Sequence, residues 1–173
     1  MKVAPLDVPS LTTERLLLRM LHAGDFEEYA AIHTDPEVTK YTVGHQLDRS
    51  DAWRHFSMIA GHWHLRGFGM WGVFEKSTGA LVGRAGFHEP DGWPDFELGW
   101  TLGRNWWGKG YASEAAKRCA EFAFQEMDRD HLISIIDPFN TPSIRVAERI
   151  GETLQGELQR GQQRLLVYGM KRT

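Results

Sequence analysis

The glycine-rich stretch from Gly99 to Ala116, GWTLGRNWWGKGYASEAA, is the part of the sequence whose residue types most clearly indicate chemistry. Glycines let the backbone come close to a ligand, and this stretch leads directly into an alanine-rich helical pattern. The start of a helix offers unpaired N–H groups and about half a positive charge from the helix dipole. The stretch therefore predicts a site for a phosphate group at the start of a helix.

Two nucleotide-binding motifs come close to this stretch. Residues Gly103–Lys109 fit the beginning of G-x-x-x-x-G-K-[ST], but Gly110 stands where a Ser or Thr would hold magnesium. Residues 108–113 approach the dinucleotide fingerprint G-x-G-x-x-G, with Asp137 in the place of a ribose ligand, yet Ser113 replaces the third glycine. A dinucleotide fold also normally begins with this unit and repeats it. A nucleotide-binding protein that uses the Gly103–Lys109 loop is therefore the less favoured alternative.

The elements around the loop predict an α+β fold. Apolar and alternating runs bounded by turn residues predict strands at 16–19, 69–75, 81–88, 95–102, 131–136, 152–157 and 164–170. Periodic apolar positions predict helices at 25–33, 49–63, 111–127 and 143–150. Short connections make the second to fourth strands an antiparallel meander, and the helix after the glycine loop joins two strands in one crossover. We expect a mixed, mostly antiparallel central sheet with flanking helices and one parallel strand–helix–strand crossover.

Length and composition indicate one globular domain over residues 1–173. The chain is long enough to bury a core, and it shows neither an internal repeat nor a low-complexity linker. With 42% hydrophobic and 25% charged residues and no apolar run of about 18 residues, no membrane span is expected. A net charge of −3 without a basic run gives no footprint for nucleic acid or an anionic membrane surface.

Cysteine usage and the first residues of the chain predict a cytoplasmic location. The single cysteine, Cys119, excludes an intrachain disulfide, and its place on an apolar helical stripe predicts core packing rather than a nucleophile. The first twenty residues lack the apolar region of a signal peptide. His62 and His64 are not expected to bind a metal, because alternate positions on a helix point apart, and we predict a solvated helix end there.

Three segments of the chain carry a family resemblance. They are Glu97–Leu102 with Trp107–Ala115, Thr13–Arg19, and Asn140–Gly151. In order, they resemble the acetyl-coenzyme A motif, the opening strand and the N-x-x-S helix of the GNAT N-acetyltransferases, in particular the branch of the ribosomal-protein N-terminal acetyltransferases RimJ and RimL. The chain departs from the pattern at Trp107, where the superfamily motif has Gln or Arg, and at Glu152, where the branch usually has Phe.

The resemblance implies a GNAT fold and an N-acetyltransferase. Its expected reaction moves an acetyl group from acetyl-coenzyme A to a primary amine, on a protein N-terminus or a small molecule, by direct attack in a ternary complex without a metal. Backbone N–H groups of a splayed strand are expected to hold the pantetheine, and those of the loop the pyrophosphate. The cofactor-binding residues implied are Trp100, Thr101, Leu102, Trp107, Gly108, Lys109, Gly110, Tyr111, Ala112, Ser113, Asn140 and Ser143.

Acetyl transfer also needs a base and an acid. We expect Glu97 to accept the amine proton, directly or through a water, with His88 and Glu89 as alternatives. The family helix implies that Ser143 donates a proton to the leaving thiolate, whereas simple helix capping is its other interpretation. Trp93, in a loop between strands, is a candidate for the acceptor pocket.

The sequence does not identify the acceptor, and it leaves open whether the chain is a monomer or a homodimer. A domain that binds coenzyme A as a sensor, without turnover, is the alternative from a different class.

Overall fold

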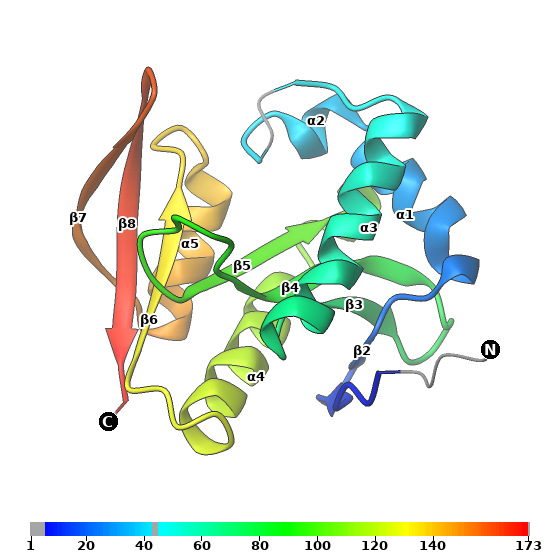
Figure 1. Ribbon diagram of the computed structural model, residues 1–173, viewed down its shortest axis with the longest axis horizontal. Helices are drawn as coiled ribbons and strands as arrows, with labels where there is room; N and C mark the ends of the chain where they lie inside the picture. Colours follow the sequence, from blue (N-terminus) through cyan, green and yellow to red (C-terminus); the bar gives the residue numbers. More distant parts are fainter. Residues whose placement is uncertain (1–5, 43–44, 173) are drawn as a thin grey trace.

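The computed structural model describes residues 6–42 and 45–172. Its strands are β1 (Leu11–Thr12), β2 (Leu16–Arg19), β3 (Met70–Glu75), β4 (Leu81–His88), β5 (Glu97–Leu102), β6 (His131–Ile136), β7 (Thr153–Arg160) and β8 (Gln163–Lys171). Its α-helices are α1 (Phe26–His33), α2 (Pro36–Thr39), α3 (Arg49–Arg66), α4 (Tyr111–Gln125) and α5 (Thr141–Ile150). The strands form one sheet in the order β1-β2-β3-β4-β5-β6-β8-β7, which Figure 1 shows from β2 on the right to β7 on the left.

One pair of neighbouring strands in this sheet is parallel. β5 and β6 pair in parallel at Glu97↔Ile133, whereas the other neighbours pair antiparallel. The connection between β5 and β6 contains the glycine loop and α4, as a parallel crossover requires. The predicted α+β class, with an antiparallel meander and one parallel crossover, is confirmed.

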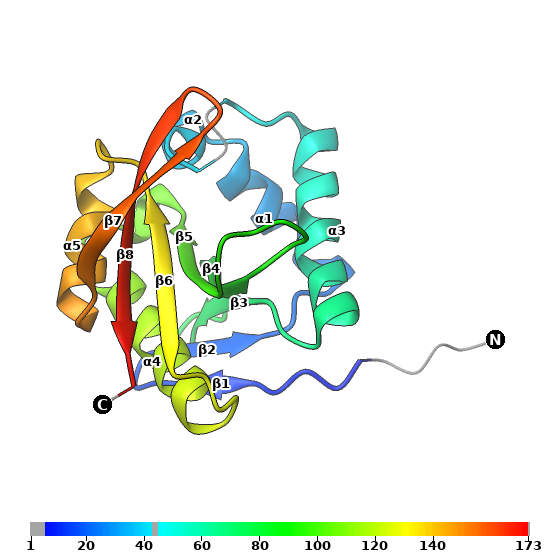
Figure 2. The ribbon, with the colours of Figure 1, turned by 60° about the vertical axis from the view of Figure 1, so that its left-hand side comes forward.

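The two faces of the sheet carry separate clusters of buried side chains. On one face, α4 brings small residues such as Ala115, Ala116 and Cys119 against Phe87 and Leu98. On the other face, α1 and α3 cover a second cluster, and the two views in Figures 1 and 2 show α3 and α4 on different sides of the sheet. Cys119 is fully buried, and burial raises the pKa of its thiol, which confirms its expected core role.

Local signals account for most element boundaries. Asp48 caps the start of α3 by accepting from the N–H of Asp51 at 2.8 Å, and Gly67 ends this helix in the left-handed conformation with φ +75°. Gly151 ends α5 in the same way with φ +101°. The short strand β1 and the one-turn helix α2 were not predicted, because elements of two and four residues carry too little periodicity.

The prediction of a solvated helix end at His62 was wrong. α3 continues to Arg66, and His62 is buried, where its Nδ1 lies 2.7 Å from the carbonyl oxygen of Phe68 and its Nε2 accepts from the N–H of Glu89 at 3.1 Å. His64 is exposed, as predicted. Periodicity alone did not show that this turn of α3 packs against the start of β3.

None of the helices in residues 6–42 and 45–172 is both long and apolar enough to cross a membrane.

Candidate functional site

Strands β5 and β6 separate immediately after their one paired position. The N–H of Ile133 donates to the carbonyl of Phe96 at 3.1 Å, and in a regular parallel ladder the N–H of Ile135 would next bond the carbonyl of Leu98. Instead, the hydroxyl of Ser134 lies 2.7 Å from that carbonyl, and the N–H of Ile135 bonds the carboxyl group of Glu97. Two side chains thus replace the ladder where the strands diverge.

A second buried carboxyl group, that of Glu152, contacts Ser134 where β5 and β6 diverge. Glu152, the residue between α5 and β7, is 2% exposed, and its Oε1 lies 2.9 Å from Oγ of Ser134. Burial raises the pKa of Glu152 to about 7, the hydrogen-bonded contact with Ser134 lowers it, and the nearby Glu97 raises it further. The departure from the family pattern at this position is therefore a buried polar contact and not a lost core residue.

A cavity of about 810 Å³ opens at the divergence of the two strands. It lies between α3 and the segment that follows α2 on one side and the β7–β8 hairpin on the other, and the tips of both sides reach the same end of the molecule in Figure 1. The predicted site residues that line it are Glu97, His88, Trp93, Trp100, Thr101, Asn140 and Ser143. Predicted site residues that lie far apart in the sequence thus line the same cavity.

Glu97 lines the cavity at the point where β5 and β6 begin to diverge. Trp93 donates its indole N–H to Oε2 of Glu97 at 2.7 Å, and the guanidinium of Arg160 lies 4.4 Å from the centre of the Trp93 ring. Burial raises the pKa of Glu97 to about 7, although the bonds from Trp93 and Ile135 and the charges of Arg84 and Arg160 lower it. A carboxyl group with this pKa can accept and release a proton near neutral pH.

The two alternative bases lie in less suitable places. His88 is the cross-strand neighbour of Glu97 and lines the cavity, but burial first, and then the charge of Arg84, lower its pKa to about 4. Such an imidazole is neutral at pH 7 and is a weak base. The side chain of Glu89 does not line the cavity. The geometry therefore favours Glu97 among the three.

At the far side of the cavity, Asn140 caps α5. Its Oδ1 accepts from the N–H of Ser143 at 3.3 Å, so Asn140, and not Ser143, is the capping residue of this helix. The helix begins at Thr141, two residues earlier than predicted. The capping interpretation of the Ser143 hydroxyl is therefore wrong, and this hydroxyl stays available at the cavity wall.

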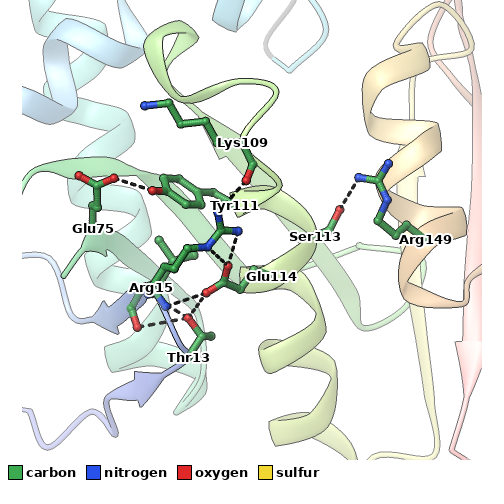
Figure 3. A network of polar contacts seen from close by, with 9 residues as sticks. Thr13, Arg15, Glu75, Lys109, Tyr111, Ser113, Glu114 and Arg149 are labelled. Atoms are coloured by element: carbon green, nitrogen blue, oxygen red, sulfur yellow. Dashed lines mark hydrogen bonds and ion pairs between the residues drawn. The ribbon is translucent and has the colours of Figure 1, made fainter. Parts of the chain in front are cut away.

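The glycine loop lies at the other end of β5, where it leads into α4 (Figure 3). Gly108 and Gly110 adopt left-handed backbone conformations, with φ +75° and +81°, that side chains rarely take. Gly110 precedes the first turn of α4, and no side chain caps that turn. The first N–H groups of a long helix thus stay without a side-chain cap, after a loop whose backbone conformation favours glycine.

Three long side chains hold the loop in this conformation. Arg15, next to β2, donates from Nη1 to the carbonyl of Lys109 at 2.9 Å and from Nε to Oε2 of Glu114 at 2.7 Å. Glu114 also accepts from the hydroxyl of Thr13 at 2.5 Å. From α5, Arg149 donates to Oγ of Ser113 at 3.2 Å and places a cation beside the helix start (Figure 3). Arg15 and Arg149 are not among the predicted site residues, because only the fold brings their elements to the loop.

The predicted cofactor-binding residues in and beside the loop differ in whether their side chains are exposed or buried. Trp107 is 47% exposed and donates its indole N–H to the carbonyl of Leu102 at 2.8 Å. Tyr111 points into the protein, where its hydroxyl donates to Oε1 of Glu75 at 2.5 Å. Leu102 is buried in the core, and Ala112 packs against that core. Leu102, Tyr111 and Ala112 can therefore contribute backbone groups to a ligand more readily than side chains.

This arrangement fits the parts of acetyl-coenzyme A. The uncapped start of α4 suits a pyrophosphate, and the separated strands β5 and β6 leave a slot for the amide-bearing pantetheine chain. The buried hydroxyl of Thr101 in the cavity has no hydrogen-bond partner among the described residues. Across residues 6–42 and 45–172, no group of three or more His, Cys, Asp or Glu side chains could hold a metal ion.

The fold and site define an acetyltransferase of the GNAT class. The chain belongs to this family: the model of the "Acetyltransferase (GNAT) domain" matches residues 15–153. Family membership makes the protein an acyltransferase that depends on acetyl-coenzyme A.

Sequence relatives and solved structures agree with this assignment. The YkkB protein of Bacillus subtilis is 30% identical over 93% of this chain and 95% of its own length. The N-acetyltransferase p20 of Bacillus licheniformis is 33% identical over 86% and 85%. A crystal structure of an acetyltransferase from Agrobacterium tumefaciens is 34% identical, covers 99% of both chains and has a TM-score of 0.87. RimL, the ribosomal L7/L12 α-N-protein acetyltransferase, shares the fold at a TM-score of 0.76 and 13% identity over 94% of this chain and 98% of its own.

Proposed function

We propose that this protein acetylates a primary amine by direct attack in a ternary complex, with Glu97 as the base. The observation that carries the proposal is the place of Glu97, whose carboxyl group lies in the cavity where β5 and β6 diverge. Acetyl-coenzyme A supplies an activated acetyl group as a thioester. The loop from Gly108 to Ser113 and the edges of Trp100 to Leu102 would hold it through backbone N–H groups.

The proton transfers follow from the pKa values of the groups. As the amine nitrogen bonds to the acetyl carbon, it loses a proton to Glu97, whose pKa is about 7. An α-amine titrates near ~7.7–8.0 and a lysine near ~10.4, so Glu97 is matched to an α-amine much better than to a lysine. On the other side, the hydroxyl of Ser143 donates a proton toward the departing sulfur and is reprotonated from solvent.

The protein N-terminus and the small-molecule amine both stay in the proposal as acceptors. A cytoplasmic location, a monomer or homodimer, and the absence of nucleic-acid and membrane partners remain our expectations. Family membership favours acetyl-coenzyme A over a nucleotide as the ligand of the Gly103–Lys109 loop.

The test is release of free thiol from acetyl-coenzyme A in the presence of a panel of amines that includes N-terminal peptides of ribosomal proteins. We expect thiol release that depends on one class of amine and falls in Glu97→Gln. Tight binding of acetyl-coenzyme A without thiol release from any amine would instead support the sensor alternative.

A further inference from the structure

Arg84, on β4, is a buried cation without an acidic partner. It is 8% exposed and lines the cavity. Its Nε donates to Nε2 of His33 at 3.3 Å, and its Nη1 contacts Sδ of Met70. Within the described residues, none of the ion pairs includes Arg84. A guanidinium group that is removed from water without an opposite charge is strongly unfavourable unless a ligand supplies that charge.

The groups around Arg84 do not supply a negative charge. Burial and the charge of Arg84 keep the pKa of His33 well below its usual value and lower that of His55 to about 3. Burial raises the pKa of Tyr29, so its hydroxyl stays neutral. Glu97 is close enough for Arg84 to lower its pKa, but it does not lie within ion-pair distance, and burial still raises its pKa to about 7.

The register of β4 and β5 places Arg84 and Glu97 on the same face of the sheet. Arg84 pairs with Thr101, Gly86 with Gly99, and His88 with Glu97. Because alternate residues share a face of the sheet, these side chains point to the same side, and between them the methyl group of Met70 occupies the place that a side chain at Gly99 would take. On this side of the sheet the cavity is therefore lined by a buried cation, Arg84, and by the carboxyl group of Glu97, at positions four residues apart in the register.

Thr101 adds a second unpartnered group beside Arg84. It is the cross-strand neighbour of Arg84, lines the cavity, and its buried hydroxyl has no hydrogen-bond partner among the residues that the structure describes. A guanidinium and a hydroxyl side by side form a donor pair that matches the oxygens of a carboxylate or phosphate. The cations Lys40 and Arg160 also line the cavity, so that with Arg84 they outnumber its carboxyl groups, those of Glu97 and Asp137, and favour an anion.

We propose that Arg84 and Thr101 bind an anionic group of the acceptor, which is therefore a primary amine that also carries a carboxylate or a phosphate. The inference rests on the proposed function for the amine itself. The amine would lie at Glu97 and the anion at Arg84 and Thr101, in the cavity that all three side chains line. An amine without an anion would leave Arg84 uncompensated.

Matched acceptors test this specificity. Glycine, β-alanine and γ-aminobutyrate are each compared with their amides, and phosphoethanolamine with ethanolamine, by thiol release. We expect kcat/KM to be at least about tenfold higher for the anionic member of a pair, since a hydrogen bond to a charged group is worth about that factor. The carboxylate and phosphate arms show which anion the site prefers. Equal values for all pairs in the wild-type protein would overturn the proposal.

Variants then locate the effect. Arg84→Met should bring the ratio of the two kcat/KM values close to one, Arg84→Lys should reduce it partly, and Thr101→Val should reduce it a few-fold. Thr101→Val removes an unpartnered buried hydroxyl, so it keeps the test valid if Arg84→Met does not fold. Arg66→Met, on the exposed end of α3, is the control for loss of one positive charge. A selective loss of acetyl-coenzyme A affinity in Arg84→Met would assign Arg84 to the cosubstrate and contradict the proposal.

A binding measurement separates this inference from the proposed function. Calorimetric titration of phosphoethanolamine and γ-aminobutyrate needs no turnover. If no amine releases thiol, the proposed function fails, yet binding that is lost in Arg84→Met still supports the anion site. If thiol is released equally from neutral and anionic amines, the proposed function stands and the anion site fails.

Discussion

Ser134 and Glu152 share one proton network behind the divergence of β5 and β6. Oγ of Ser134 lies 2.7 Å from the carbonyl of Leu98 and 2.9 Å from Oε1 of Glu152, and a hydroxyl has only one proton to donate. If that proton goes to the carbonyl, which can only accept, Glu152 must donate to Ser134, and so Glu152 must itself be protonated. The raised pKa of Glu152 agrees with this arrangement.

Glu152→Gln should therefore make stability less dependent on pH. The pKa of Glu152 rises from 4.5 to about 7 on folding, so the stability that its neutral form contributes is complete below pH 4.5 and is lost as the pH rises to about 7. Urea unfolding at pH 5 and pH 8 should show that the stability of the Glu152→Gln variant relative to the wild-type protein grows with pH, by about 1–3 kcal/mol. Glu14→Gln, at an exposed position, is the control. An unchanged difference at the two pH values would show that Glu152 is ionised in the folded protein.

Glu97→Gln should remove the acidic limb of the rate profile. The base must be ionised to accept a proton, so kcat/KM of the wild-type protein should rise with pH up to about 7, the pKa of Glu97. The substitution should lower turnover by about 10²–10⁴-fold and leave acetyl-coenzyme A affinity in place. The measurement needs an acceptor amine that is already neutral in mildly acidic solution. A limb that persists in Glu97→Gln and disappears in His88→Asn would assign the base to His88.

Gly110→Val should weaken acetyl-coenzyme A binding by about tenfold or more, or ~1.4 kcal/mol. The φ of Gly110 is +81°, so a side chain there strains the loop, and its Cβ would lie 3.5 Å from Nη2 of Arg15, which holds the loop in place. Gly79→Val is a matched control, because Gly79 has φ +75° and open space around it in the turn between β3 and β4. Calorimetric titration of both variants should show a loss for Gly110→Val alone. Equal losses would mean that general strain, and not the loop, controls binding.

Ser143→Ala should lower turnover with little change in melting temperature. Asn140 caps α5, so Asn140→Ala should lower stability by about 0.5–2 kcal/mol, near the low end because its bond to the N–H of Ser143 is 3.3 Å long. If Ser143 protonates the departing sulfur, the rate loss in Ser143→Ala should shrink with a thioester whose thiol is a better leaving group. An equal rate loss with two acyl donors of different leaving groups would count against the acid role.

Arg15→Met should weaken acetyl-coenzyme A binding several-fold, because it releases the carbonyl of Lys109 and the carboxylate of Glu114. Arg172→Met is the matched control. Arg172 is 43% exposed like Arg15, and it likewise bonds one carboxylate, that of Asp128, and one carbonyl, that of Phe124, but far from the loop. We expect both variants to lose a similar, small amount of melting temperature. A loss of acetyl-coenzyme A binding in Arg15→Met alone would confirm that Arg15 positions the loop.

The sequence by itself determined most of the elements and the glycine loop of this protein. Alternation, turn residues and glycines act over a few positions, so they revealed the meander from β3 to β5, the crossover through α4 and the loop at Gly108 and Gly110. The same local signals revealed Glu97 as a candidate, because it begins the strand that leads to the loop. They misplaced His62, whose burial depends on how α3 packs on β3.

Only the tertiary structure decided what surrounds Glu97 and the loop. Trp93, Ser134 and Arg84 come from three different segments, and Glu152 from a fourth, so no spacing along the chain could show that they meet. The pKa of Glu97 depends on burial by these neighbours and not on its own sequence context. Long-range pairing of strands sets that burial, and for this reason the chemistry of the cavity follows from the fold, whereas the glycine loop follows from local sequence.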